Sequence, residues 1–300
     1  MAVSLQNIFY QKDVIQSLGT IAFNGLLHRD KKSFPEVHTQ GAYKTRTIQP
    51  LNERLVAEYI SHVGGKKGNY KNTIPFHFFP HWLVPVLSDT MAEIPFSMLK
   101  IINGGCSVKI NQPLHFGEKL LVKARLENID VGDTRVIIKQ KAITETNTKP
   151  NALVVEQTTI IPLAKNGNKK STKKKDSDDK TIPVAVTEIG SFYAVANAGW
   201  EFALLTGDVN PLHWLQPYAN ASGFKRPILH GYSSFARTME QLNRNLFSGD
   251  TSTLQAVEVK FVAPFYLPGE ARVFIDNTGQ FYAGNVPGGI AYLKGSYTTK

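Results

Sequence analysis

The chain has 300 residues, 42% of them hydrophobic and 19% charged, and a formal net charge of +10 at pH 7. This composition is typical of a globular protein with room for two ordinary domains, and it excludes a fibrous or wholly disordered chain. No window approaches the ~18 consecutive apolar residues of a transmembrane helix, and the first residues lack the pattern of a secretory signal. The one cysteine, Cys106, has no partner for an internal disulfide. We therefore expect a cytoplasmic protein that does not interact with membranes.

Part of the positive charge is concentrated in one segment. Residues 165–180 hold seven lysines against three aspartates, with no residue that could enter a core. Such a run predicts a flexible linker between a first unit, 1–164, and a second unit, 181–300. The basic surface would suit an anionic carrier, such as coenzyme A or an acidic acyl carrier protein. A nucleic-acid partner is not expected, because no nucleic-acid module or interleaved basic and aromatic motif occurs.

The first unit reads as an apolar helix followed by strands. We expect the helix around residues 81–92. Cys106 follows it in an apolar run, where a buried structural thiol is favoured over a reactive one. Strands rich in Val, Ile and Leu are expected at 119–128, 134–144 and 152–162. Residues 1–45 carry no pattern from which we predict a structure or a role.

The second unit repeats this order with one additional helix. The spacing of apolar residues predicts a helix over 191–205, and a central helix is expected over 231–246. Four strands are then expected, at 255–265, 271–277, 280–286 and 289–298.

Two segments of the chain share one plan. Residues 106–118 and 257–270 each read as a strand with alternating apolar residues, then a proline, a short apolar stretch and a Gly-Glu turn into another strand. Each segment follows an apolar helix candidate, so a tandem duplication is favoured over two unrelated domains. A long apolar helix covered by an antiparallel sheet in each unit is an α+β fold.

The segment that could carry chemistry runs from Thr206 to His213. Gly207 is expected to end a helix in the conformation that glycine tolerates. Asp208, Asn210 and Pro211 would then form a turn, since Asp and Asn bond their own backbone. Asp208 and His213 would converge there, and a carboxylate and an imidazole that share one water form an acid–base pair.

Gly231 is the second element of this candidate site. It is expected to open a helix, so that its N–H is one of the donors without a partner inside the helix. Without a Cβ, it lets a substrate carbonyl approach closely. A donor at the positive end of a helix would stabilise a developing enolate oxygen. The spacing alone is equally compatible with a common turn and a structural histidine.

A resemblance favours the catalytic interpretation. The runs 203–213 and 226–231, with an Ala/Ser-containing stretch between them, resemble the signature of the MaoC-like, hydratase-2 family of hot-dog folds. The resemblance implies a double hot-dog fold, with two tandem units that each wrap a sheet around a long helix. It also implies reversible syn addition of water to a trans-2-enoyl thioester, which gives the (R)-3-hydroxyacyl thioester of fatty-acid metabolism.

The same resemblance assigns roles to residues of the second unit. It implies that Asp208 and His213 hold the catalytic water, and that Asn210, with Pro211, supports the loop. It implies further that the amide of Gly231 binds the thioester carbonyl. No cofactor is implied beyond coenzyme A or the acyl carrier protein that bears the substrate.

The first unit resembles the degenerate half of double-hot-dog dehydratases, through the run 74–82. Residues 61–69 stand where the second unit has its acid and histidine, and they offer neither in register. We therefore expect the first unit to be non-catalytic and to help enclose the acyl chain or the carrier arm. Its histidines at 77, 81 and 115 lie among apolar residues and are expected to be structural.

Several features leave alternatives open. Lys225 and Arg226 could steer phosphates of the carrier, although solvated surface charge is the simpler interpretation. Trp82, Trp200 and Trp214 could line an acyl tunnel or pack in the core. No zinc-ligand spacing, dinucleotide fingerprint, phosphate loop or serine-hydrolase motif occurs, so neither a metal nor a redox cofactor is expected.

Two other functions fit the same fold. One is a non-catalytic module that binds acyl thioesters, and the other is a hot-dog thioesterase, because fold does not determine function. Two hot-dog units in one chain can pair with each other, so a monomer and a homodimer are both expected forms.

Overall fold

The computed structural model describes residues 3–17, 19, 40–92, 94, 101–163 and 180–300. Of the predicted linker at 165–180, only Lys180 is among them. The division into units 1–164 and 181–300 therefore stays a prediction. None of the helices in these ranges combines the length and the hydropathy needed to cross a membrane.

The described elements are helices of four to 15 residues, short 3-10 helices and strands of five to 12 residues. Up to residue 162 they are η1 (Leu5–Gln11), β1 (Lys44–Ile48), α2 (Glu53–His62), α3 (Lys67–Tyr70), η2 (Phe76–Phe78), α4 (Pro80–Thr90), β2 (Ile102–Ile110), β3 (Leu120–Val131), β4 (Arg135–Glu145) and β5 (Leu153–Pro162). Beyond residue 180 they are β6 (Thr187–Ala194), α5 (Ala198–Thr206), η5 (Pro211–His213), α6 (Gln216–Ala221), α7 (Gly231–Asn245), β7 (Leu254–Phe261), β8 (Gly269–Ile275), β9 (Gln280–Gly284) and β10 (Ala291–Thr299).

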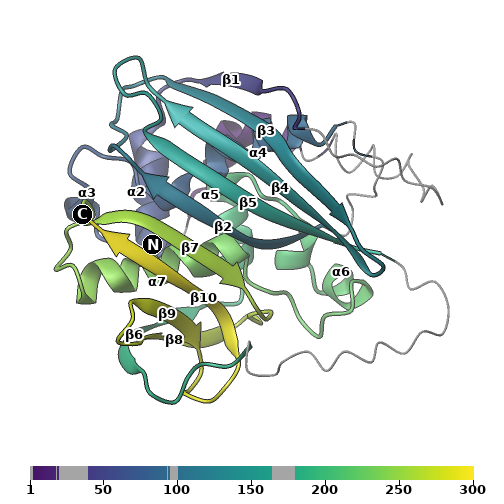
Figure 1. Cartoon of the computed structure of the whole chain (residues 1–300), viewed down its shortest axis with the longest axis vertical. Helices are drawn as coiled ribbons and strands as arrows, with labels where there is room; N and C mark the ends of the chain where they lie inside the picture. The colour runs from purple at the N-terminus through teal and green to yellow at the C-terminus, as the bar shows by residue number, and fades with distance from the viewer. Residues whose placement is uncertain (1–2, 18, 20–39, 93, 95–100, 164–179) are drawn as a thin grey trace.

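One antiparallel sheet contains all ten of these strands, in the order β1-β3-β4-β5-β2-β7-β10-β9-β8-β6 (Figure 1). Each half starts at an outer edge of the sheet with its first strand along the chain. Its third, fourth, fifth and second strands follow in that order toward the middle of the sheet. The halves join where β2 pairs antiparallel with β7, from Gly105 opposite Lys260 to Lys109 opposite Ala256. This repeated order, closed by an antiparallel junction, is the double hot-dog arrangement that the sequence predicts.

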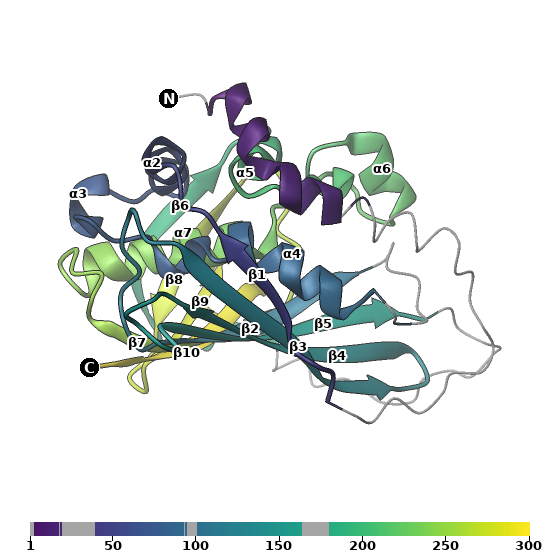
Figure 2. The same cartoon turned by 90° about the horizontal axis from the view of Figure 1, so that it is seen from above.

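The helices gather on one face of the sheet, and each half has its own central helix (Figure 2). These are α4, which contacts β3, and α7, which contacts β6 and β10. Both were expected from the sequence, at 81–92 and 231–246, and both are confirmed to within a few residues. Several side chains of α7 are small and buried, among them Ser233, Ser234 and Ala236.

The expected helix over 191–205 is wrong in its first part. Residues 187–194 form β6, which pairs with β8 at the edge of the sheet and places Phe192 opposite Ala271. Burial alternates along the strand, with Phe192 and Ala194 buried and Ser191 and Tyr193 exposed. The apolar residues of this segment also fit one face of a helix, so their spacing alone does not identify a strand. Pairing with the free edge of β8 favours the strand over the helix.

The two halves share one hydrophobic core. A single cluster of buried side chains includes Tyr59 and Trp82 from the first half and Phe202 and Phe235 from the second. Rings meet directly across the boundary, as with Tyr59 and Phe202, whose centroids are 6.1 Å apart. Cys106 is buried in this core, as expected. The candidate site therefore lies in a body to which both halves contribute.

Candidate functional site

The site begins where α5 ends. Gly207 takes a left-handed conformation with a φ of 82°, and its N–H donates to the oxygen of Ala203 at 2.7 Å. This is the glycine cap that the sequence predicts, because only glycine adopts such a φ without strain. A Cβ at this position would also lie 2.6 Å from Cβ of Val14. The chain turns sharply here and presents Asp208 next.

Hydrogen bonds within the loop shape the turn between Asp208 and His213. The N–H of Asn210 donates to Oδ1 of Asp208 at 3.4 Å, and the Oδ1 of Asn210 accepts from the N–H of Leu212 at 3.1 Å. Asn210 thus caps η5, with Pro211 in its first turn. The ideal Cβ at Gly199 would lie 1.9 Å from the oxygen of His213. The glycine in α5 therefore lets the turn pack directly against that helix.

One nitrogen of His213 is already engaged. Its Nδ1 lies 2.8 Å from the main-chain oxygen of Ile228, and a carbonyl can only accept, so Nδ1 donates. Burial lowers the pKa of His213, while the Asp208 carboxylate and the Ile228 carbonyl offset part of that shift. A neutral ring bonded in this way leaves Nε2 unprotonated. Among the residues that the structure describes, no donor is bonded to this nitrogen, so His213 offers an acceptor beside Asp208.

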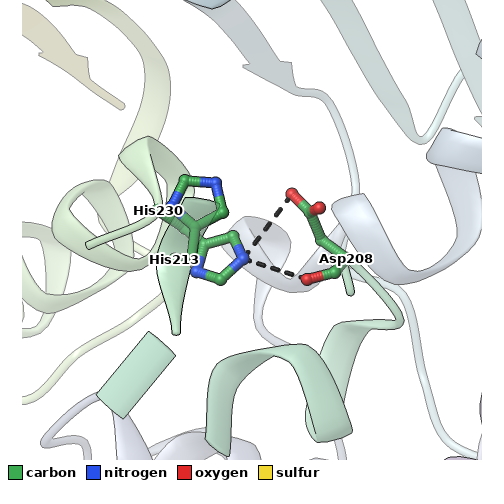
Figure 3. Close-up of side chains that lie close together, drawn as sticks. All are labelled: Asp208, His213 and His230. Atoms are coloured by element: carbon green, nitrogen blue, oxygen red, sulfur yellow. Dashed lines mark hydrogen bonds and ion pairs between the residues drawn. The ribbon is translucent and has the colours of Figure 1, made fainter. Parts of the chain in front are cut away.

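His230 is the third residue of the cluster, and it is not among the site residues predicted from the sequence. Its ring stacks on that of His213, with centroids 3.6 Å apart and an angle of 28° between the planes. Its Nε2 donates to the main-chain oxygen of Asp208 at 3.0 Å and lies 3.8 Å from Oδ2 of that residue (Figure 3). The sequence feature that could have identified it as a site residue is its place directly before Gly231, inside the run 226–231.

His230 is held neutral. Burial lowers its pKa well below the ordinary value, and the neighbouring His213 lowers it further. Its Nδ1 is buried and has no hydrogen-bond partner among the described residues. The side chain of His230 is only 2% exposed, whereas that of Asp208 is 32% exposed. Asp208 and His213 are thus the partly exposed members of the cluster, and His230 is the buried one.

Gly231 is the first residue of α7, as the sequence predicts. The side chain of its N-cap residue, His230, does not cap the helix, so within the part of the chain that the structure describes the first N–H groups have no side-chain cap. An ideal Cβ at Gly231 would lie 3.0 Å from three carbons of the Phe261 ring. Glycine here permits Phe261 to pack against the start of the helix.

The first half contributes a polar contact beside Gly231. The hydroxyl of Tyr232 donates to Oε1 of Gln157, on β5, at 2.8 Å. The Tyr232 ring meets Phe79 edge-on, with centroids 5.1 Å apart. The start of α7 is therefore enclosed by side chains of the other half.

Asp208, His213 and His230 also form a group that could hold a metal ion, because their ligand atoms all lie within 4.8 Å of one another. A tetrahedral zinc ion keeps its ligand atoms about 3.4 Å apart, given bonds of about 2.0–2.1 Å. Two of the four imidazole nitrogens of His213 and His230 donate hydrogen bonds to main-chain oxygens. The expectation of a site without a metal stays a prediction that a chelator can test.

The other predicted residues lie around this cluster. Lys225 and Arg226 are exposed on the loop before α7, and the Arg226 guanidinium lies 5.8 Å from the centre of the Tyr266 ring. Their role toward a carrier stays a prediction. Trp200 and Trp214 meet edge-on at 5.1 Å and line an open hollow of about 450 Å³. Trp82 is a core residue whose indole N–H donates to Thr144, so it does not line this hollow.

Two histidines of the first half, His77 and His81, are held in buried contacts, whereas His115 is half-buried. His77 is fully buried, with its nitrogens 3.0 Å from the hydroxyls of Tyr59 and Tyr70 and Nε2 3.1 Å from Oε1 of Glu240. The Nδ1 of His81 donates to Oε1 of Gln11 at 2.9 Å. Neither His77 nor His81 bonds a side chain of the cluster around Asp208 in these contacts.

The chain is similar in sequence to one protein family and to several enzymes. A sequence profile described as a MaoC like domain matches residues 168–285. The chain is 25% identical to the peroxisomal multifunctional enzyme type 2 of Mus musculus over 211 residues, which are 67% of this chain and 28% of that protein. It is 32% identical to the peroxisomal enoyl-CoA hydratase 2 of Arabidopsis thaliana over 69 residues, 23% of this chain and 22% of that protein. The matches span less than a third of these relatives.

Solved structures of similar fold cover most of the chain. HtdX of Mycobacterium tuberculosis has a TM-score of 0.66 at 18% identity, over 86% of this chain and 100% of that one. Another protein of the same organism, described as having a double hotdog fold, has a TM-score of 0.56 at 12% identity, over 87% of this chain and 97% of that one. At such identities the likeness shows the fold, and function has to be argued from the site.

Proposed function

We propose, from the premise that residues 168–285 are a MaoC-like domain, that the chain is a hydratase of trans-2-enoyl thioesters and, in reverse, a dehydratase of (R)-3-hydroxyacyl thioesters. The observation that carries the proposal is the convergence of three groups. They are the Asp208 carboxylate, the Nε2 of His213 and the N–H groups at the start of α7, which directly follow His230, the third member of the cluster. The relative from Arabidopsis thaliana is named as an enoyl-CoA hydratase.

The two side chains can hold one water as acceptors. An ionised Asp208 and a neutral His213 with a bare Nε2 each accept one hydrogen, which leaves an oxygen lone pair for the substrate. In hydration, that oxygen bonds to Cβ of the enoyl group, and one proton passes to Asp208 or His213. The same group returns the proton to Cα. Hydroxyl and hydrogen thus add across the double bond, and the enzyme regains its starting state.

The amide of Gly231 would bind the thioester carbonyl. Attack at Cβ moves negative charge onto that carbonyl oxygen, because the intermediate has enolate character. The first turn of α7 offers N–H groups and the positive end of a helix of 15 residues. Donors fixed in advance at such a position lower the barrier more than mobile water would.

The first half would enclose the acyl chain. Tyr232, Gln157 and Phe79 lie beside the start of α7, and the acyl group has to leave the thioester carbonyl near Gly231. The carrier is coenzyme A or an acyl carrier protein in this proposal, with Lys225 and Arg226 near its phosphates and no further cofactor. Two relatives are named as peroxisomal, so the cytoplasmic location stays a prediction, as does the choice between monomer and homodimer.

The test follows two products at once. Crotonyl-coenzyme A and a longer enoyl-coenzyme A are offered, and loss of the enoyl-thioester absorbance is measured together with release of free thiol. The proposal expects the (R)-3-hydroxyacyl thioester without thiol release. Thiol release without hydration would identify a thioesterase. Binding of both coenzyme A and carrier-protein substrates without either product would identify a non-catalytic module.

A further inference from the structure

Gln11, at the end of η1, is fully buried, with 0% of its surface exposed. Its Nε2 donates to the main-chain oxygens of Leu204, at 3.1 Å, and Leu205, at 2.9 Å. Both oxygens lie in the last turn of α5, where main-chain oxygens have no N–H donor within the helix. A side chain from the start of the sequence therefore caps the helix that leads into the candidate site.

The last turn of α5 depends on this contact. The oxygen of Ala203 accepts from the N–H of Gly207, and the next two oxygens accept from Gln11. Together these bonds provide a donor for each main-chain oxygen from Ala203 to Leu205. Asp208 follows two residues after Thr206, the last residue of the helix. Any shift in this turn therefore moves the Asp208 carboxylate.

Packing adds to the hydrogen bonds. An ideal Cβ at Gly207 would lie 2.6 Å from Cβ of Val14 and 3.0 Å from Oε1 of Gln11. Val14 is itself buried. The N-terminal segment thus presses against the residue directly before Asp208, as Figure 2 shows for η1 beside α5.

The segment is fastened to the first half as well. Nδ2 of Asn7 and the N–H of Ser4 both donate to Oε2 of Glu58, on α2, at 2.8 and 3.1 Å. Gln11 accepts from Nδ1 of His81, near the start of α4, at 2.9 Å. Gln11 therefore connects the central helix of the first half to the end of α5 in the second.

We propose that Gln11 is a positioning residue for the hydration reaction, acting through the end of α5 to place the Asp208 carboxylate against His213. The proposal rests on the proposed function of the site. Gln11 bonds α5 and His81 rather than Asp208 or His213, so its effect is exerted on their geometry. It also gives a role to a part of the chain for which the sequence predicts none.

The test replaces Gln11 by Met in the full chain. Methionine has a similar length but provides neither the two donors nor the acceptor for His81. We expect kcat to fall about ten- to a hundredfold, with KM within about twofold, because a misplacement of about 1 Å suffices for such a loss. Amide exchange at residues 206–210 should accelerate. The matched control is Asn7→Ala, which removes a buried amide of the same segment that bonds Glu58 instead of α5.

The control separates positioning from general destabilisation. Asn7→Ala should keep kcat within about twofold and leave exchange at 206–210 unchanged, even where both variants lower the melting temperature. Equal kcat values for the two variants, or unchanged exchange in Gln11→Met, would overturn the proposal. Val14→Ala keeps the hydrogen bonds and loosens the packing on Gly207, so it should show the same changes in milder form if Gln11→Met does not fold.

Failure of the proposed function would look different. Wild-type protein without hydratase activity would contradict that function. Amide exchange at residues 206–210 in Gln11→Met would then still show whether Gln11 holds the end of α5 in place. Active wild-type protein, inactive Asp208→Asn and fully active Gln11→Met would keep the function and remove the role of Gln11.

Discussion

His230 Nε2 lies 3.0 Å from the main-chain oxygen of Asp208, so the residue before Gly231 holds the backbone of the acidic residue. This bond connects the start of α7 to the loop after α5. The two parts of the proposed site, the water-binding pair and the carbonyl-binding amide, are therefore fixed relative to each other by one side chain. The stack of His230 on His213 adds a second connection.

His230→Phe tests that connection. Phenylalanine keeps an aromatic ring against His213 but donates no hydrogen bond to Asp208, so kcat should fall about tenfold or more as the loop loosens. Stability should change by no more than about 1–2 kcal/mol, because the variant also removes the unpaired Nδ1. Steady-state kinetics and urea unfolding measure the two quantities. Unchanged kcat would show that the bond does not serve the reaction.

Gly231→Ala tests the close approach at the start of α7. Its Cβ would lie 3.0 Å from the Phe261 ring, so we expect either the ring or the first turn to shift and kcat/KM to fall about ten- to a hundredfold. Gly231→Ala combined with Phe261→Leu should regain part of that loss if the ring is the obstacle. A double variant no better than Gly231→Ala would assign the effect to blocked access of the substrate carbonyl.

Stability should depend on pH through the buried histidines. Burial lowers the pKa of His81 to about 4 and that of His230 well below its ordinary value. Below the ordinary pKa of about 6.5 the unfolded chain binds protons that the folded chain refuses, so stability falls there by up to about 1.4 kcal/mol per pH unit and histidine. Above it, both states are neutral and these residues contribute no slope. Urea unfolding from pH 4.5 to 8 measures this, with His81→Gln expected to flatten the acid side.

Activity should depend on pH in the same direction. Protonation of His213 would occupy the Nε2 that accepts from water in the proposed mechanism, and burial lowers the pKa of this histidine. Hydration should therefore stay constant through neutral pH and decline on the acid side, below about 6.5. A profile of kcat/KM against pH that declined already above neutral pH would contradict a neutral His213 as acceptor.

A chelator should leave hydration unchanged. The Asp208, His213 and His230 ligand atoms lie within 4.8 Å of one another, yet two of their nitrogens are bonded to carbonyls. Dialysis against a chelator, followed by assays with and without added Zn²⁺, measures the dependence. Loss of activity that Zn²⁺ restores would turn the cluster into a metal centre and replace the water-binding pair proposed above.

Much of the site could be predicted because it is local in the sequence. Asp208 and His213 are separated by one turn, and the cap at Gly207 follows from the chemistry of glycine. The repeat was readable for a similar reason, since both segments carry the same alternation and the same Gly-Glu turn. The strand order then follows from duplication.

Contacts between distant parts of the chain could not be predicted. Gln11 lies 193 residues before Leu204, and nothing near either residue indicates the bond. The strand β6 depends on the free edge of β8, which local spacing does not reveal. His230 was visible in the motif, but its bond to Asp208 depends on how α7 packs against the loop.

The most direct test of the proposed function compares wild-type protein with Asp208→Asn, using crotonyl-coenzyme A and chiral analysis of the product. Asparagine keeps the shape of the side chain and an oxygen for the N–H of Asn210, so the fold should persist while turnover falls by about 10²–10⁴. Asp250→Asn, at an exposed loop residue, is the matched control and should remain active. We predict an (R)-3-hydroxybutyryl product from the wild type and from Asp250→Asn. An Asp208→Asn variant with full activity, or an (S) product, would contradict the proposed site.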